Sequence, residues 1–395
     1  MGVFWTLYTA GQIPMIDIRP IVAGNPRAVF VVNTDLRSMD DRIGFLGWGR
    51  RLGEQIFVDV PGNEAQQVVL KPNITLGFAQ EAGGIVPGQE GVVTDPYFLA
   101  GLADGLRVAG AERVVMAEGG EANDPIGRLW CRGHGYLMAE RGVEVLDLNT
   151  PRYTESSAYT DFNWVHVDGV FFRDIPFVPP INSSDALVVN VPTLKAHNLT
   201  GFSLSVKNLQ GMLPQGEIRA FCRGVERLRS FPDHVSRLVQ PDAADRVAQQ
   251  ASQHRLLGYR DWEDEAQAIR NEGYCAQAMD CLSGARVRLH LVEGIRSRDG
   301  SGFRHGTDYL TNLVVFGTNA ISVDAVCAYL VGHRPESVGY LRIGCERGLG
   351  ENEIGRIEIY LWNDGDPKRV EDPSSMKRYA IGAHLHGDRS APVFF

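Results

Sequence analysis

From residue 28 onward, short apolar runs rich in valine alternate with longer segments whose apolar positions recur at helical spacing. This alternation is typical of a parallel sheet covered by crossover helices, because such strands are buried on both faces. Strands are expected at residues 28–34, 66–73, 112–119, 143–149 and 185–192. The pattern therefore predicts an α/β fold with a mostly parallel, Rossmann-like sheet.

One crossover helix is well delimited, at residues 94–110. Thr94 or Asp95 can serve as its N-cap, and Gly110 follows its last apolar position. Asp95 and Asp324 both stand at predicted helix starts, where a carboxylate complements the helix dipole. Capping is a sufficient explanation for both acids.

Residues 221–280 differ from the rest of the chain, because they are dense in Arg, Asp, Glu and Gln and poor in Val. This composition predicts a solvated helical insertion or lid. A second, smaller α/β unit is expected after it, with strands at 286–294, 312–318 and 356–362 and helices at 320–332 and 335–348. We therefore expect a two-lobed protein with an N-terminal α/β lobe, an insertion, a C-terminal α/β lobe and a turn-rich surface tail, at residues 1–220, 221–280, 281–365 and 366–395.

Composition narrows the range of partners. The net charge is -9 and no Lys/Arg-rich run is present, so nucleic acid, whose binding depends on clustered cations, is not an expected partner. No stretch approaches the roughly eighteen apolar residues of a membrane helix, and the N-terminus lacks the basic region of a secretory signal. Six scattered cysteines without a C-x-x-C pair predict reduced thiols in a cytoplasmic protein, with neither a zinc knuckle nor an iron–sulfur cluster. The sequence leaves open whether the protein forms a homo-oligomer.

The use of lysine is the most informative feature of the composition. Of 39 cationic side chains only five are lysine: Lys368 and Lys377 stand in the polar tail, whereas Lys71, Lys195 and Lys207 each follow an apolar segment. Because arginine is the default cation here, a lysine beside a strand indicates a task for which guanidinium is unsuited. Such tasks are neutralising an anion with a compact charge, transferring a proton at a lowered pKa, or forming a Schiff base. The alternative is chance, with the lysine stems covering the sheet edge.

Lys195 and His197 lie two residues apart, so an extended backbone would aim both to the same side. Together with Lys71 they follow predicted strands, at the sheet edge where open α/β folds bind ligands. A neighbouring lysine lowers the pKa of a histidine, which favours a neutral imidazole that can accept a proton. A hydrogen-bonded structural imidazole is the alternative for His197.

Several other polar residues are candidates for the same site. Glu118 and Glu293 end predicted strands, which favours a role as general base or metal ligand. A loop is expected at residues 293–308, which are rich in glycine and arginine, so its backbone N–H groups and guanidinium groups could bind a carboxylate or phosphate. The alternative is a mobile, solvated loop without a binding role. The predicted catalytic residues are Lys195, His197, Lys207, Glu118 and Glu293, and the predicted substrate-binding residues are Lys71, Asn73, Asn208, Arg296, Arg298, Arg304 and His305.

Five stretches resemble a broad prokaryotic family catalogued as domain of unknown function 362: VVLKPN (68–73), TDPYFLAGLADGLRVAGAERVVMAEG (94–119), DALVVNVPTLKAHNLTGFSLSVKNLQG (185–211), ISVDAVCAYLVG (321–332) and YLRIGCERGLG (340–350). The resemblance implies that the family's signature positions here are Lys71, Asn73, Asp95, Lys195, His197, Lys207, Asn208 and Asp324. It also implies redox chemistry or the handling of iron–sulfur clusters in the many relatives that carry ferredoxin-like cysteine motifs. This chain lacks those motifs, which puts such a role in doubt for it.

These observations favour an enzyme that binds a small, oxygen-rich anionic metabolite and moves protons with lysine and histidine, as an isomerase, lyase or decarboxylase does. No Walker A or G-x-G-x-x-G motif specifies an organic cofactor, so the cofactor is unknown. Whether the protein binds a divalent metal stays open, and His384 and His386 are one weak candidate pair of ligands. Two alternatives also remain: an oxidoreductase that uses a metal or a separate iron–sulfur partner, and a non-catalytic anion-binding protein.

Overall fold

The computed structural model describes residues 14–61, 67–75, 90–119, 133–257, 264–302, 305–385 and 391–395. Within these ranges the main sheet has eleven strands. In spatial order they are β15 (Asp366–Arg369), β14 (Glu358–Asn363), β2 (Ala28–Asn33), β13 (Asp308–Gly317), β12 (Leu289–Arg298), β9 (Ala186–Val191), β4 (Gln67–Pro72), β5 (Val114–Glu118) and β6 (Glu144–Asp147), with β10 (Thr193–His197) beside β12 and β11 (Gly201–Ser203) beside β10.

The strands from β12 through β9, β4 and β5 to β6 are all parallel, and β13 runs antiparallel between β12 and β2. The prediction of an α/β fold with a large, mostly parallel sheet is therefore confirmed. The strands of the two expected α/β lobes hydrogen-bond into one continuous sheet, because β12 pairs with β9 and β13 pairs with β2. The domain boundaries stay a prediction.

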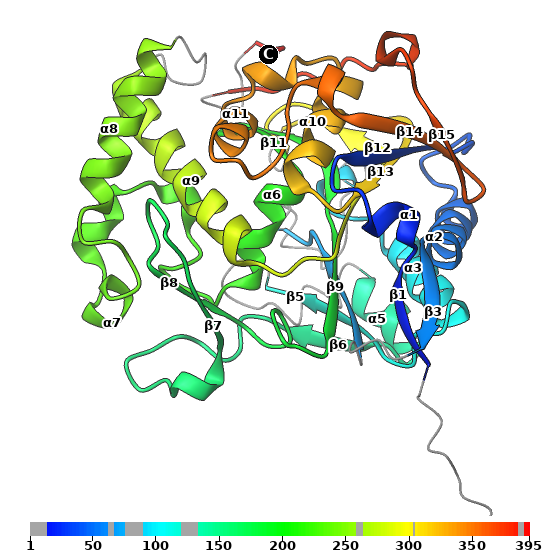
Figure 1. Ribbon diagram of the computed structural model, residues 1–395, viewed down its shortest axis with the longest axis horizontal. Helices are drawn as coiled ribbons and strands as arrows, with labels where there is room; N and C mark the ends of the chain where they lie inside the picture. The colour runs from blue at the N-terminus through cyan, green and yellow to red at the C-terminus, as the bar shows by residue number, and fades with distance from the viewer. Residues whose placement is uncertain are drawn as a thin grey trace, which may run out of the picture.

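Helices cover both faces of this sheet (Figure 1). Along β2, Phe30 and Val32 face α2 (Arg42–Ile56) and α3 (Pro96–Val108), whereas Val29 and Val31 belong to the opposite core. That opposite core includes buried residues of α9 (Glu265–Gly284), α10 (Ala320–Leu330) and α11 (Gly339–Glu346). The two-residue alternation of a strand thus gives each helical layer its own apolar surface.

The helix α3 was predicted, whereas α2 was not. Asp95 caps α3 as expected, since its side chain accepts the N–H groups of Tyr97 and Phe98. In α2 several glycines weaken the helical signal of the sequence. They allow a close approach of the two helices, because a Cβ atom at Gly49 of α2 would lie 2.1 Å from the carbonyl oxygen of Phe98 in α3.

Within residues 221–257 and 264–284 the structure has two short 3-10 turns followed by α7 (Asp233–Ser236), α8 (Ala243–Leu256) and α9. Most of α9 is buried against the rest of the protein, so this helix is part of the core rather than a detached lid. Exposed residues dominate 366–380, but Ile381, Ala383 and Phe395 are buried in the core, which differs from the expected surface tail.

The remaining elements are small. Two antiparallel two-stranded sheets lie outside the main sheet. None of the described helices combines the length and the apolar character that crossing a bilayer requires. The additional elements are β1 (Pro14–Ile18) paired with β3 (Phe57–Pro61), β7 (Asn163–His166) paired with β8 (Asp174–Phe177), and the short helices α1 (Pro20–Ala23), α5 (His134–Ala139) and α6 (Ser205–Asn208).

Candidate functional site

A cavity of about 410 Å³ opens at the carboxyl ends of β4 and β5 and along β10. Its volume lies in the range of small-molecule sites, roughly 300–1,000 Å³. Glu118 is the one carboxylate among the described residues that line it. Five cations line it as well: Lys71, Lys195, Lys207, Arg219 and Arg270. The three lysines that follow apolar segments therefore share one cavity, whereas Lys368 and Lys377 are exposed elsewhere.

The sheet explains how these residues meet. Lys71 is the penultimate residue of β4 and Glu118 the last of β5, and parallel neighbours end at the same edge. After β9, Pro192 interrupts the strand, and β10 continues beside β12 with a shifted register. Lys195 and His197 on β10 both line the cavity, in agreement with their two-residue spacing.

Lys71 and Glu118 form a buried ion pair, with 2.8 Å between Nζ and Oε1. Glu118 also accepts the backbone N–H groups of Ile74, at 2.9 Å, and Gly119, at 2.8 Å. Burial lowers the pKa of Lys71, and the attraction of Glu118 opposes this effect. With three donors on its carboxylate, Glu118 is suited to hold Lys71 in place, so the geometry does not favour it as a general base.

Lys195 is held by neutral groups. Its Nζ donates to Oδ1 of Asn73 at 2.7 Å and to the carbonyl oxygen of Val92. Asn73 in turn donates to Oδ1 of Asn208 at 3.2 Å, and Asn208 donates to Oδ1 of Asn190 at 2.7 Å. These hydrogen bonds help to fix the position of the Lys195 ammonium group.

His197 is a neutral imidazole. Burial is the largest cause that holds its pKa well below the ordinary value of 6.5, and nearby cations lower the pKa further: Lys207, Lys195 and Arg270. Its Nδ1 accepts the backbone N–H of Leu199 at 3.1 Å. In a neutral ring with an accepting Nδ1, the hydrogen resides on Nε2. The geometry therefore favours His197 as a hydrogen-bond donor, whereas the sequence predicted a proton acceptor.

Lys207 and Arg270 approach the cavity on the two sides of Cys222. Lys207 Nζ lies 3.3 Å from the Cys222 sulfur and 4.9 Å from the ring centre of Tyr274, in a cation–π contact. Arg270 Nε donates to the Cys222 carbonyl oxygen at 2.9 Å. Cys222 has a free thiol and lines the cavity as well.

Arg219 is a lining residue that sequence reasoning did not single out. Its guanidinium donates to carbonyl oxygens of Leu148, Leu213 and Gly119. Burial lowers its pKa to about 10, although Glu118 opposes the shift. Arg219 and Arg270 are two of the 34 arginines in the chain, so residue type alone cannot distinguish them.

Asp324 was expected to cap its own helix, which is wrong. α10 begins at Ala320 with Asn319 as N-cap, and Asp324 lies in its interior. Its carboxylate instead accepts the N–H groups of Ser205, at 2.8 Å, and Val206, at 3.1 Å, and so caps the first turn of α6. Burial raises its pKa to about 7. Asp324 is thus a positioning residue for the helix that carries Lys207 and Asn208.

The predicted arginine-rich loop is placed differently from expectation. β12 extends to Arg298, so Arg296 and Arg298 lie in a strand. Arg296 faces Asp95, with 3.5 Å between Nη1 and Oδ2, and Arg298 pairs with Asp308 at 2.6 Å. Neither arginine lines the lysine cavity. His305 is exposed, and Arg304 lies outside the described residues.

Glu293 is also separate from the lysine cavity. It is buried in β12, where its carboxylate accepts the N–H of Ile295 at 2.9 Å and that of Asp95 at 3.3 Å. Burial raises its pKa to about 7, with a further contribution from the charge of Asp95. Glu293, Asp95 and Arg296 form a second buried polar cluster, in which Glu293 has a structural role.

This pKa gives a pH-dependent prediction for Glu293→Gln. Glu293 titrates near 4.5 when unfolded and near 7 when folded, so between these values the folded state holds more protons and stability falls as pH rises. The unfolding free energy of the variant should therefore rise relative to wild type across this window, by up to about 3 kcal/mol. Urea denaturation at a series of pH values measures this difference. Glu144→Gln, at an exposed carboxylate, should give a flat difference, and a flat difference for Glu293→Gln would refute the assignment.

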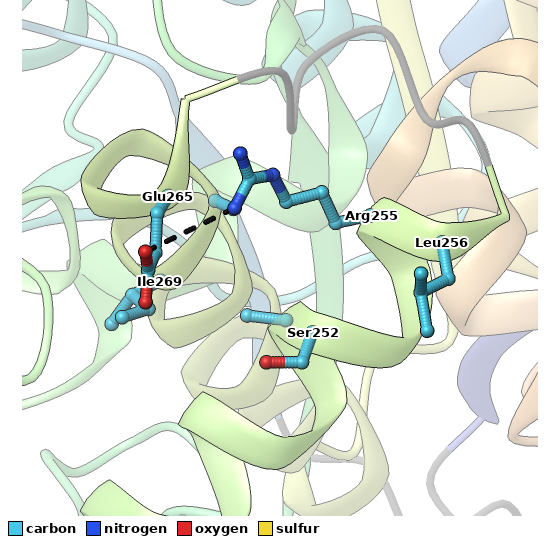
Figure 2. Close-up of a pocket in the computed structure, with 7 residues that line it drawn as sticks. Ser252, Arg255, Leu256, Glu265 and Ile269 are labelled. Carbon is cyan, nitrogen blue, oxygen red and sulfur yellow. Dashed lines mark ion pairs between the residues drawn. The ribbon is translucent and has the colours of Figure 1, made fainter.

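A second hollow, of about 420 Å³, lies between α8 and α9 (Figure 2). Arg255 extends across it toward Glu265, with 4.0 Å between Nη1 and Oε2, while Leu256 lies on the other side. Apart from Ser252, the rest of its lining is apolar. It lacks the converging cations and perturbed groups of the lysine cavity, which is therefore the candidate functional site.

The described residues contain no group of three or more His, Cys, Asp or Glu side chains arranged to hold a metal ion. His386 lies outside the described residues, so the pairing of His384 with His386 stays a prediction. The lysine cavity offers one carboxylate and one imidazole in its described lining, and its character is cationic.

The structure is that of an α/β protein with a cation-lined cavity at the carboxyl ends of its strands. Residues 68–329 match the family described as "Domain of unknown function (DUF362)", and this range includes the five cations of the cavity and the capping residue Asp324. The chain therefore belongs to the DUF362 family, as its motifs indicated. A search of curated proteins finds no match.

Proposed function

We propose that this protein is an enzyme that performs acid–base chemistry on a small, anionic, oxygen-rich metabolite, as an isomerase, lyase or decarboxylase. One observation carries the proposal: five cations and a single carboxylate, among the described residues, surround a cavity of metabolite size. Preorganised ammonium and N–H donors stabilise negative charge that develops on oxygen, which is what formation of an enolate requires.

Lys195 and His197 would act on the developing oxyanion. They project to the same side of β10, and both are buried, so their donors meet a substrate oxygen with little competition from water. The neutral His197 donates through Nε2. His197 keeps its Nε2 proton when it donates this hydrogen bond, so it binds the oxyanion and stays neutral.

Lys71 would accept the substrate proton. At rest Lys71 is the charged partner of Glu118, and burial, which lowers its pKa, eases the loss of its proton to give the neutral amine that such a base needs. In the proposed step, a C–H proton moves to Lys71 Nζ, and its electron pair moves into the substrate to form an enolate. The carboxylate of Glu118 then stabilises the protonated amine at 2.8 Å. Return of the proton to another carbon gives isomerisation, and loss of a leaving group gives elimination.

Solvent-deuterium exchange tests this proposal while the substrate is still unidentified. The protein is incubated in D₂O with a mixture of anionic metabolites, and mass spectrometry follows deuterium uptake and product formation. Reversible proton abstraction should place deuterium in one compound or a small related group. Lys368→Ala, at an exposed lysine, should behave as wild type.

Three outcomes would contradict the proposal. An anion retained by the protein without any chemical change would indicate a binding protein. A product formed only when an electron donor is supplied would indicate an oxidoreductase. Exchange that persists unchanged in Lys71→Met would exclude Lys71 as the base.

A further inference from the structure

We propose that Asn208 is a positioning residue that fixes Lys71 directly and Lys195 through Asn73. The sequence predicted Asn208 as a substrate-binding residue, so this inference assigns it a different role. Its effect on the reaction rests on the proposed function, whereas its effect on the two lysines does not.

The side chain of Asn208 is buried between two neighbouring strands. Asn208 ends α6, is 4% exposed, and reaches the carboxyl ends of β4 and β9. Its Nδ2 donates to Asn190 Oδ1 at 2.7 Å and faces the carbonyl oxygens of Lys71 and Pro72, each at 3.2 Å. Its Oδ1 accepts Lys71 Nζ at 3.4 Å and Asn73 Nδ2 at 3.2 Å.

These contacts occupy the hydrogen-bonding groups of the Asn208 amide. An amide nitrogen carries two hydrogens and an amide oxygen has two lone pairs. Both atoms of Asn208 already face at least two partners within the protein. Although Asn208 borders the cavity, its amide has little capacity left for a substrate. The side chain is therefore better suited to hold its neighbours than to bind a ligand.

The surroundings also determine which way the amide points. If the amide were reversed, its nitrogen would face the donors of Lys71 and Asn73, and its oxygen would face three other oxygens. Buried donors and acceptors would then be left without partners, which costs free energy. Asn208 thus presents an acceptor to Asn73 Nδ2, and this directs Asn73 Oδ1 to Lys195 Nζ at 2.7 Å.

The backbone of Asn73 is held separately from its side chain. Its N–H donates to Thr94 Oγ1 at 2.9 Å, and its carbonyl oxygen accepts the Thr94 N–H at 3.0 Å. Loss of Asn208 should therefore release the Asn73 amide while the Asn73 backbone stays in place. The effect of Asn208 on Lys195 is then transmitted by one identifiable side chain.

This arrangement matters for the proposed reaction because the two lysines act on different atoms of one substrate. Lys71 removes the proton and Lys195 stabilises the oxyanion, so the distance between their nitrogens has to match the substrate. A misplacement of about 1 Å can slow a reaction by about 10²-fold. Asn208 sets the positions of both groups from one place.

Nuclear magnetic resonance of lysine-labelled protein tests the positioning role without a substrate. Asn208→Ala should shift the side-chain resonances of Lys71 and Lys195 and leave those of Lys368 and Lys377 in place. Asn208→Ser, which retains a hydroxyl group, should give the same pattern with smaller shifts and serves if the alanine variant does not fold.

A second background separates transmission through Asn73 from a general disturbance. In Asn73→Ala protein, adding Asn208→Ala should still shift the Lys71 resonance but should no longer move that of Lys195. Asn182→Ala is the control for lost stability, because Asn182 is a buried asparagine that bonds Gly284 and Arg286 outside the described lining of the cavity. It should leave the lysine resonances unchanged.

The deuterium-exchange assay distinguishes positioning from substrate binding. With the compound that the wild-type protein labels, Asn208→Ala should lower the saturated exchange rate by about 10–100-fold and change the half-saturating concentration by less than about threefold. Loss of a substrate contact would instead raise the half-saturating concentration.

Three results would overturn the positioning role. They are an unshifted Lys195 resonance in the folded Asn208 variants, a Lys195 shift that persists in the Asn73→Ala background, and a defect confined to the half-saturating concentration. Coupled lysine shifts in a protein that exchanges no compound would reject the proposed function and retain the positioning role. Exchange by the wild type with an unshifted Lys195 resonance in the variants would do the reverse.

Discussion

Replacing Lys195 by alanine is expected to slow deuterium exchange by about 10²–10³-fold, the usual effect of removing one preorganised oxyanion donor. Lys195 is buried and fixed by Asn73 and Val92, so its charge acts on the substrate at short range and with little screening. The exchange rate under substrate saturation measures the effect. Lys195→Arg should recover only part of the rate, since a planar guanidinium cannot take the place of a compact ammonium group.

The controls for Lys195→Ala address folding and surface charge. A cooperative unfolding transition of the variant in urea shows that a loss of exchange does not come from misfolding. Lys368→Ala removes an exposed lysine from β15 and should retain the full exchange rate. A Lys195→Ala variant that keeps more than about a tenth of the wild-type rate would contradict a role at the oxyanion.

Breaking the ion pair between Lys71 and Glu118 should cause a large loss of stability. Lys71→Met or Glu118→Gln leaves one buried charge without its partner, which costs about 3–5 kcal/mol. The double variant removes both charges and should recover most of this loss, because replacing a buried pair by neutral groups is often close to neutral. Urea denaturation of wild type, the two single variants and the double variant gives the unfolding free energies of this double-mutant cycle.

A surface pair provides the matched control. Arg113 and Glu144 form an ion pair at 2.7 Å with both side chains about half exposed, and Arg113→Ala should cost less than about 1 kcal/mol. The double variant at Lys71 and Glu118 should remain without deuterium exchange although it is stable. A double variant no more stable than the single variants would refute the interpretation of Lys71 and Glu118 as a coupled buried pair.

The sequence predicted the main strands because their valine-rich runs are buried on both faces of the sheet. It did not predict α2, whose glycines weaken the helical pattern but are accommodated by close packing on α3. It also missed β10, because Pro192 ends one strand and the next continues in a shifted register beside β12. Both omissions concern features whose cause is a contact with a distant segment.

The same reasoning applies to the site. Lysine scarcity identified Lys71, Lys195 and Lys207, which all line the cavity. Arg219 and Arg270 escaped notice because arginine is common throughout the chain, and only tertiary packing selects these two. Arg296 and Arg298 were assigned to a loop because glycines follow Glu293, yet pairing with β13 extends β12 to Arg298 and directs both arginines to structural partners.

The scarcity of lysine also permits the most direct test of the central claim, that Lys71, Lys195 and Lys207 together form an anion site. Selective isotope labelling of lysine should give five side-chain resonances, which single-lysine substitutions assign. On titration with phosphate as an anionic probe, the resonances of Lys71, Lys195 and Lys207 should shift, and those of Lys368 and Lys377 should stay in place. Uniform shifts of all five resonances, or no shift of the three cavity lysines, would contradict the account.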